Sequence, residues 1–470
     1  MTNAAGTDGN GVERTLFRIL IALVALAPLP LASNRPLPAA LLALCAGILL
    51  VVWSLHASFG KTGIAFPVAR IRWPLILFGA TAFWIAVQAL PIAPAGLADP
   101  IWAEASQALH TPLGASISVN PGATLTGLMR LLSYAAIFWL ALQLGGPSRE
   151  ARLAVTSIAL IGAAYALYGL VIYAMGNETV LIYSKTAYRS ALSSTFINRN
   201  SFATFAGLAL LAAVAWFVNG FRHLLTIKRP LRQRMAMIAE TIFGRGILRT
   251  LAVLALLMAL VLTGSRAGVA SGLVGLFVLL LTFMRGNTLR LSHAVAIAGG
   301  IGLAVAAVLL VNGELLASRL ATLDGDASTR DRGTVYTATI EAIGSAPWTG
   351  TGFGTYREVF VAYRPEELSS TVLWDKAHQV YLENALELGI PAALCLNLSI
   401  LLLAVEALRG LWRRRDRTAP AIGVAATVLV AVHSLFDFSL QMPAVAAFYA
   451  FILGIAVAGA WPQPRPRGLA

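Results

Sequence analysis

Twelve apolar runs follow one another along this chain, each close to the length that a helix needs to cross a membrane. A span requires roughly 20 mainly apolar residues to traverse the hydrocarbon core. The runs lie at Leu16–Ser33, Leu37–Leu55, Pro74–Ala95, Leu128–Gly145, Leu153–Gly176, Asn200–Asn219, Ile247–Gly264, Ala267–Met284, Ala294–Asn312, Val380–Leu403, Ala421–Phe436 and Met442–Trp461. Only 12% of the residues are charged, against roughly 25% in soluble domains. The sequence predicts an all-α polytopic membrane bundle of about 12 transmembrane helices.

The distribution of charge along the chain predicts which side each loop faces. With a cytoplasmic N-terminus, the inner segments hold 23 of the 35 lysines and arginines but only 6 of the 21 acids, giving +17 inside and −3 outside. This asymmetry satisfies the positive-inside rule, so we expect both termini to be cytoplasmic. Because the net charge of +14 is accounted for by short inner loops, we expect no nucleic-acid partner.

One outer segment, residues 313–377, is far longer than a connection between spans 9 and 10 requires. Long ordered loops often carry function. We therefore expect a single transmembrane domain over residues 1–470, with residues 313–377 forming a subdomain outside the membrane. Asp324–Ser328 resembles the start of a calcium loop, but Thr329 and Val335 replace its glycine and glutamate. No metal site and no cofactor are expected.

Two arginines lie where spans meet the outer surface, Arg199 within Asn198–Phe202 and Arg266 within Thr263–Gly268. Positive-inside topology disfavours arginine there, and an ionisable group near the bilayer is costly. A planar guanidinium can hold phosphate oxygens bidentately, and neighbouring glycines allow a ligand to approach. The alternative is that each arginine simply snorkels to the interface.

A histidine, His378, precedes the tenth span within Lys376–Gly389. Its side chain can act as a general base on a hydroxyl because the ordinary pKa of histidine is close to ambient pH. It can equally be a structural residue at a helix start. Near the end of the eleventh span, His433 and Asp437 have i, i+4 spacing, which either extends this polar cluster or forms an interhelical hydrogen bond.

These features together resemble the O-antigen ligase and polysaccharide polymerase superfamily of bacterial membrane glycosyltransferases. Its members combine about twelve spans with one long, late periplasmic loop, followed by His-Asn/Ser/Gln, nine residues and Gly; here these are His378, Gln379 and Gly389. The family motif continues two residues later with Gly, Thr or Tyr, where this chain has Ala392. Further similarities are Asn198, Asn200, Phe202, Ser265, Arg266, Gly268, Arg332, Tyr336, Pro347, Gly350, Gly352, Gly354 and Tyr356.

The resemblance implies metal-independent transfer of a glycan from an undecaprenyl-diphosphate carrier to an acceptor hydroxyl on the periplasmic side of the bacterial inner membrane. It implies that Arg199 and Arg266 hold the diphosphate, that Arg189 or Arg332 assists, and that His378 deprotonates the acceptor. Seven residues are expected to bind the substrate with them. These are Arg189, Arg332, Asn198, Asn200, Ser265, Gln379 and Tyr381.

Several functions remain open at the level of sequence. Ligation to the lipid A core in lipopolysaccharide biosynthesis, polymerisation of repeat units, and transfer to protein serine or threonine all need the same donor grip. The acceptor is accordingly a lipid, glycan or protein hydroxyl, in a site surrounded by membrane lipids. A polysaccharide or lipid transporter, or a non-catalytic scaffold for envelope assembly, are alternatives of another class. A transporter would show internal repeats and polar residues near the bilayer midplane, whereas polarity here collects at the outer surface.

Overall fold

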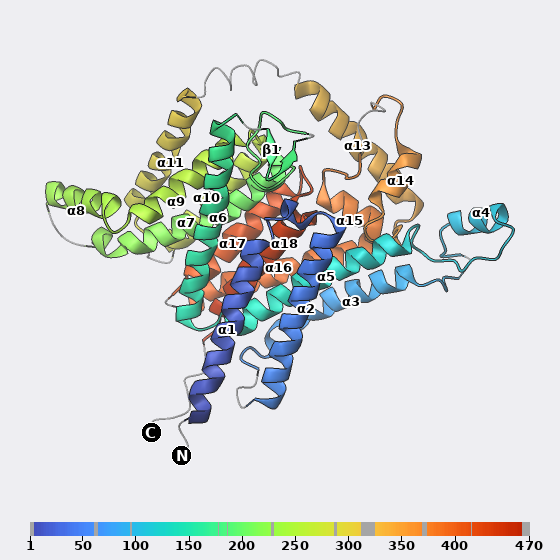
Figure 1. The fold of residues 1–470 in the computed structure, drawn as a ribbon, viewed down its shortest axis with the longest axis horizontal. Helices are drawn as coiled ribbons and strands as arrows, with labels where there is room; N and C mark the ends of the chain where they lie inside the picture. The colour runs from blue at the N-terminus through green and yellow to red at the C-terminus, as the bar shows by residue number, and fades with distance from the viewer. Residues whose placement is uncertain are drawn as a thin grey trace.

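The computed structural model describes residues 4–60, 64–94, 96–176, 178–185, 187–226, 230–285, 289–311, 325–368, 374–414 and 416–462. Apart from one two-stranded hairpin, the regular structure in these ranges is helical (Figure 1), which confirms the all-α prediction. The α-helices are α1 Ala4–Leu26, α2 Pro36–Phe59, α3 Arg72–Ala89, α4 Ile101–Ala108, α5 Pro121–Leu144, α6 Ser148–Ala174, α7 Arg199–Thr226, α8 Leu231–Phe243, α9 Ile247–Leu262, α10 Arg266–Arg285, α11 Leu291–Val311, α13 Gly325–Ser345, α14 Tyr356–Tyr363, α15 Val380–Leu388, α16 Ile390–Arg413, α17 Thr418–His433 and α18 Pro443–Gly459. Short 3-10 turns lie at Leu31–Ser33, Val68–Ile71 and Ser439–Gln441, and strands β1 Thr179–Val180 and β2 Tyr183–Ser184 pair antiparallel.

Seven helices within the described residues are long and apolar enough to cross a membrane. They are α2, α3 with its preceding turn, α5, α6, α7, α10 and α16, while α9, α11, α17 and α18 are apolar but shorter. Together with α1, they coincide with the twelve predicted runs. The first helix ends earlier than the predicted run Leu16–Ser33, because α1 stops at Leu26 and Pro28 and Pro30 follow directly. A proline has no backbone N–H to continue a helix.

The predicted tenth span is not one helix but two. Gly389 has φ +78°, a conformation that separates α15 from α16 and that glycine adopts without steric cost. Side chains of α3 bind the last carbonyls of α15, since Trp84 Nε1 donates to Leu388 O at 3.0 Å and Gln88 Nε2 to Glu387 O at 2.8 Å. The break therefore places α15 outside the membrane-crossing helix.

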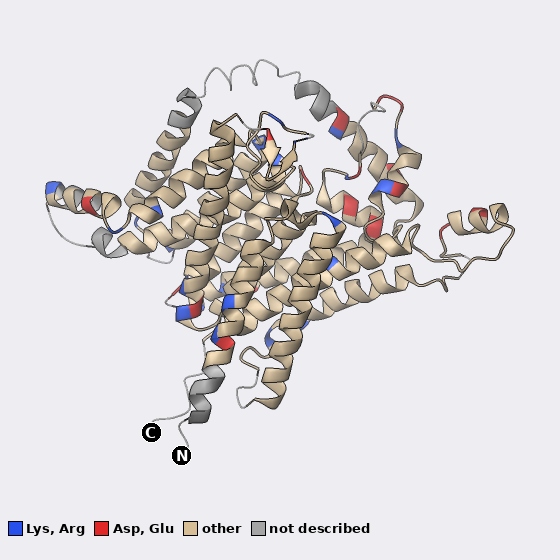
Figure 2. Ribbon diagram, in the orientation of Figure 1, with Lys and Arg blue, Asp and Glu red and all other residues tan. Residues whose placement is uncertain are grey.

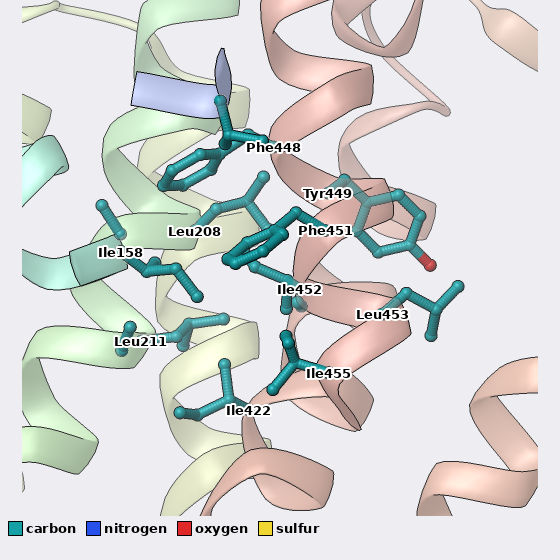
Figure 3. Close-up of a cluster of buried hydrophobic side chains, with 14 of the residues drawn as sticks. Ile158, Leu208, Leu211, Ile422, Phe448, Tyr449, Phe451, Ile452, Leu453 and Ile455 are labelled. Atoms are coloured by element: carbon teal, nitrogen blue, oxygen red, sulfur yellow. The ribbon is translucent and has the colours of Figure 1, made fainter. Parts of the chain in front are cut away.

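Helices α7 and α18 form the centre of the bundle. In α7, 89% of the apolar window is buried, and every residue of α18 from Pro443 to Ala458 is buried. Figure 3 shows side chains of α18, including Phe448 and Phe451, packed against α7 and its neighbours. The rings of Phe205 and Phe448 lie 4.4 Å apart. A helix that is apolar on all sides belongs inside a membrane bundle.

One end of the bundle carries basic residues stacked on an aromatic ring. The guanidiniums of Arg70 and Arg413 lie 4.6 and 4.2 Å from the ring centre of Trp461. Glu406 also contacts Arg413, at 3.2 Å. These arginines belong to segments predicted to face the cytoplasm. Figure 2 shows that Lys, Arg, Asp and Glu lie mostly toward the ends of the bundle and are few in its middle.

At the opposite end, α13, α14 and α15 share a separate buried cluster, which includes Val335, Tyr356, Phe360 and Leu386. Figure 1 shows α14 and α15 beside one end of α3 and α5. Residues 325–368 and 374–377 of the predicted 313–377 loop therefore fold onto α15. The remainder of that loop lies outside the described residues.

Candidate functional site

The site is built around the first turn of α7. Asn198 Oδ1 accepts hydrogen bonds from the backbone N–H groups of Asn200, at 2.7 Å, and Ser201, at 3.2 Å. This side-chain cap starts the helix immediately after Asn198. Arg199 is consequently its first residue, and its guanidinium lies over the ring of Tyr188, 5.1 Å from the centroid. The loop before α7 and the helix itself thus orient Arg199 together.

The next residue connects α7 to the segment after α17. Asn200 Nδ2 donates to Asp437 Oδ2, and Asp437 Oδ1 accepts from the backbone N–H of Phe438 at 2.7 Å. Burial raises the pKa of Asp437 to about 6, although these hydrogen bonds and the nearby charges of Arg332 and Arg199 oppose the rise. Both guanidiniums therefore lie within electrostatic reach of one buried carboxylate.

His433, four residues before Asp437, makes a second set of polar contacts. His433 Nδ1 is 2.8 Å from Thr204 Oγ1 and 3.1 Å from Ser439 Oγ. His433 and Asp437 are both 1% exposed. His433 and Asp437 are expected from the sequence either to form an interhelical hydrogen bond or to extend the polar cluster near His378. They do both, because each contacts a side chain of α7 and Asp437 lies near Arg332. Its partners on α7 lie more than 200 residues away in sequence, so spacing alone does not identify them.

Arg332 reaches the same place from α13. Its Nη1 donates to the carbonyl of Phe436 at 3.3 Å. Its charge also lowers the pKa of His378, after the larger effect of burial. Arg332 thus lies between Asp437 and His378, and it joins the loop helices to the membrane bundle.

His378 immediately precedes α15 and has an unusual backbone, with φ +55°. Its carbonyl accepts a hydrogen bond from Tyr336 Oη at 3.0 Å. The imidazole lies edge-on between Trp374, at 5.6 Å, and Phe438, at 4.8 Å. Burial, followed by the charges of Arg332 and Lys376, lowers its pKa to about 3. The ring is therefore neutral, and its buried Nδ1 has no hydrogen-bond partner among the described residues.

Gln379 and Tyr381, predicted to contact substrate, hold α15 in place. Gln379 Oε1 caps the helix by accepting from Leu382 N at 2.5 Å. Tyr381 Oη donates to Ala431 O of α17 at 2.9 Å. These contacts fix the helix that follows His378. Their direct role toward a substrate stays a prediction.

Arg266 is the first residue of α10 and is exposed. Ser265 Oγ caps this helix by accepting from Gly268 N at 3.1 Å. A Cβ on Gly268 would lie 2.5 Å from Ala203 Cβ, so α10 is packed directly on the first turns of α7. The structure therefore brings Arg266 to the same end of the bundle as Arg199, but to a more open position.

Arg189 lies in the loop before α7 and is also exposed, with 67% of its side-chain surface accessible. Its Nε lies 3.8 Å from Glu178 Oε2 and donates to Lys185 O at 3.3 Å. Arg189 thus belongs to the hairpin loop. The rest of the site consists of the buried Asn200 and the partly buried Arg199, Arg332 and His378.

The chemistry of these side chains suits an anionic ligand beside a hydroxyl. Guanidiniums bind phosphate oxygens, and a neutral buried imidazole can accept a proton. Within the part of the chain that the structure describes, no three His, Cys, Asp or Glu side chains are grouped as metal ligands would be.

Comparison with known proteins gives one result that bears on this site. Residues 251–397 match a family model described as O-antigen ligase. The matched region contains Arg266, Arg332 and His378, while Arg199 and Asp437 lie outside it. No curated protein matches the chain. This match supports the resemblance of the chain to the O-antigen ligase and polysaccharide polymerase superfamily that the motifs indicate.

Proposed function

We propose that the protein transfers a glycan from an undecaprenyl-diphosphate carrier to an acceptor hydroxyl on the periplasmic face of the inner membrane. One observation carries this proposal: two arginines from distant elements and a neutral histidine converge on one end of the bundle. Arg199 and Arg332 both act on buried Asp437, and Arg332 also acts on His378. This end is the one predicted to face outward.

Arg199 and Arg332 would grip the donor diphosphate. The Arg332 guanidinium uses Nη1 for the Phe436 carbonyl, and a guanidinium carries further N–H donors. A diphosphate supplies negative charge and several acceptor oxygens in bidentate geometry. The same arginines stabilise the charge that grows on the diphosphate as it leaves.

His378 would then accept the proton of the acceptor hydroxyl. The hydroxyl oxygen forms a bond to the anomeric carbon of the glycan, and the bond from that carbon to the diphosphate oxygen breaks. The proton passes to the imidazole of His378, and the lipid diphosphate leaves with the bonding electron pair. Burial, and after it the charge of Arg332, lower the pKa of His378. A bound diphosphate would offset the effect of Arg332 and so raise that pKa, which is the direction that a general base requires.

The exposed arginines would contribute at the edge of this site. Arg266 follows a cap formed by Ser265 and lies on the helix that packs against α7. Its open position suits first contact with the diphosphate or with the glycan. Arg189 stands on the hairpin loop beside Tyr188, the residue that lies under Arg199.

Repeat-unit polymerase and protein O-oligosaccharyltransferase activities share this donor grip and differ in the acceptor. The structural argument therefore covers all three transferases. A transporter would instead place its polar groups near the middle of the spans. Here Asn200, His378 and Asp437 lie at or just beyond helix ends, and Arg332 lies on α13, the helix that packs against α15.

The test is transfer from a lipid-diphosphate-linked glycan by purified protein in detergent with EDTA. Lipid A core, repeat units and a serine-containing protein would be offered separately as acceptors. We expect metal-independent product with one acceptor, and loss of that product in His378→Ala and Arg199→Ala. Arg35→Ala is the matched control, since Arg35 is an exposed arginine at the start of α2. Absence of product with every acceptor, or full activity in His378→Ala, contradicts the proposal.

A further inference from the structure

His378 depends on an unusual backbone conformation. Its φ of +55° lies in the left-handed region, which residues other than glycine seldom occupy without support. Such conformations persist where the surrounding contacts determine them, and they concentrate at functional sites. The direction of the imidazole is therefore set by the groups that hold residues on either side of His378.

Two of these supports are already described. Tyr336 Oη binds the carbonyl of His378, and the Gln379 cap fixes the helix that follows. On the other side, the backbone N–H of Ala377 donates to Glu383 Oε2 at 2.8 Å. Ala377 is itself fully buried, with 0% exposure.

Glu383 of α15 holds the two residues that precede His378. Its side chain is 0% exposed, and its second oxygen, Oε1, lies 3.1 Å from Lys376 Nζ. One carboxylate thus ties down two consecutive residues, Lys376 and Ala377, immediately before His378. A buried carboxylate is costly unless it is paired, and Lys376 provides the pairing charge.

We infer that Glu383 is a positioning residue for His378, acting by holding the Ala377 peptide so that the imidazole points at the acceptor hydroxyl. This inference rests on the proposed function, in which His378 is the base. Glu383 makes its contacts inside the Lys376–Ala377 segment, so its loss should misplace the base while leaving the donor grip of Arg199 and Arg332 in place. A misplacement of roughly 1 Å at reacting groups can lower the rate about 10²-fold.

Two double variants separate the Ala377 hydrogen bond from the ion pair. Lys376→Met with Glu383→Gln removes both charges but keeps an amide oxygen that can accept from Ala377 N. Lys376→Met with Glu383→Met removes both charges and the acceptor. Both variants keep Glu387, the other buried carboxyl group near Lys376, in the same charge setting, so its effect is equal in the two. Both would be measured for transfer with saturating acceptor while the donor concentration is varied, which gives kcat and the donor KM.

We expect the Gln variant to stay within a few-fold of wild-type kcat and the Met variant to lose about 10²-fold, with donor KM changed less than about threefold in both. Hydrogen exchange by mass spectrometry gives a readout independent of activity. The Ala377 amide should exchange faster in the Met variant than in the Gln variant.

Equal kcat values in the two variants, whether both retained or both lost, overturn the inference, as does a loss expressed in donor KM. Equal exchange at Ala377 overturns it as well. If the wild-type protein transfers no glycan, the proposed function fails by itself. In that case the exchange comparison still decides whether Glu383 holds the Ala377 peptide.

Discussion

Helices α7 and α10 meet without a side chain at Gly268, and this contact sets the position of Arg266 relative to Arg199. A methyl group added at Gly268 would lie 2.5 Å from Ala203 Cβ and 2.9 Å from Ser265 Oγ. Two carbons in contact are normally about 3.5–4.0 Å apart. Gly268→Ala therefore requires the helices to separate by roughly 1 Å or requires the Ser265 cap to move.

Two opposing effects set the expected change in the free energy of unfolding of Gly268→Ala. Overpacking of a buried contact costs about 1–3 kcal/mol, while alanine in place of glycine in a helix gains about 1 kcal/mol. The net change in stability is a loss of up to about 2 kcal/mol. A displacement of roughly 1 Å between the two arginines would also lower transfer by up to about 10²-fold.

The assay is thermal unfolding in detergent combined with donor KM and kcat. Gly47→Ala is the matched control, because a Cβ at Gly47 on α2 meets nothing within 4 Å. We expect Gly47→Ala to be as stable as wild type or more stable, and fully active. If Gly268→Ala matches Gly47→Ala in unfolding temperature and in both kinetic constants, the close packing of α7 on α10 does not position the arginines.

Three further predictions follow from the charges at the site. Arg332→Gln should weaken donor binding and, because the Arg332 charge lowers the pKa of His378, shift the acid limb of the kcat/KM profile to higher pH; an unmoved limb contradicts this. Arg199→Lys keeps the charge but loses the bidentate fork, so donor KM should rise about tenfold or more; unchanged KM shows that charge alone suffices. Burial and the charge of Glu383 raise the pKa of Glu387 to about 8. The folded protein therefore loses stability as the pH rises from the ordinary glutamate pKa to about 8, and Glu387→Gln should remove this loss. Parallel unfolding temperatures for wild type and Glu387→Gln between pH 6 and 9 refute that reasoning.

The sequence predicts the spans because their length and apolar character are local properties. Val380–Leu403 is predicted as one span, although Gly389 and Pro391 are local signals for a helix break. Trp84 and Gln88, about 300 residues earlier in the chain, bind the carbonyls at the end of α15. No local pattern indicates that long-range contact.

The sequence indicates the arginines and the histidine as candidates, but not the residues that hold them in place. Arg199 and His378 stand out because each is polar at the edge of an apolar run. The sequence does not indicate that Tyr188 lies under Arg199. It does not indicate either that Asp437 accepts a hydrogen bond from Asn200, because this contact exists only once α7 and the segment after α17 are side by side. A buried hydrogen bond between residues 237 positions apart has no periodicity to reveal it.

The carbonyls at the end of α15 also bear on how the protein is made. Trp84 and Gln88 enter the membrane early in synthesis, yet both donate to Thr349 O as well as to α15. The chain must grow by some 260 further residues before the Thr349 acceptor of these donors has been synthesised. Membrane proteins are synthesised from the N-terminus, so the end of α15 can be held only after Thr349, Glu387 and Leu388 have been made. A chain that ends before Leu388 would lack these contacts, and with them the support of the helix that follows His378.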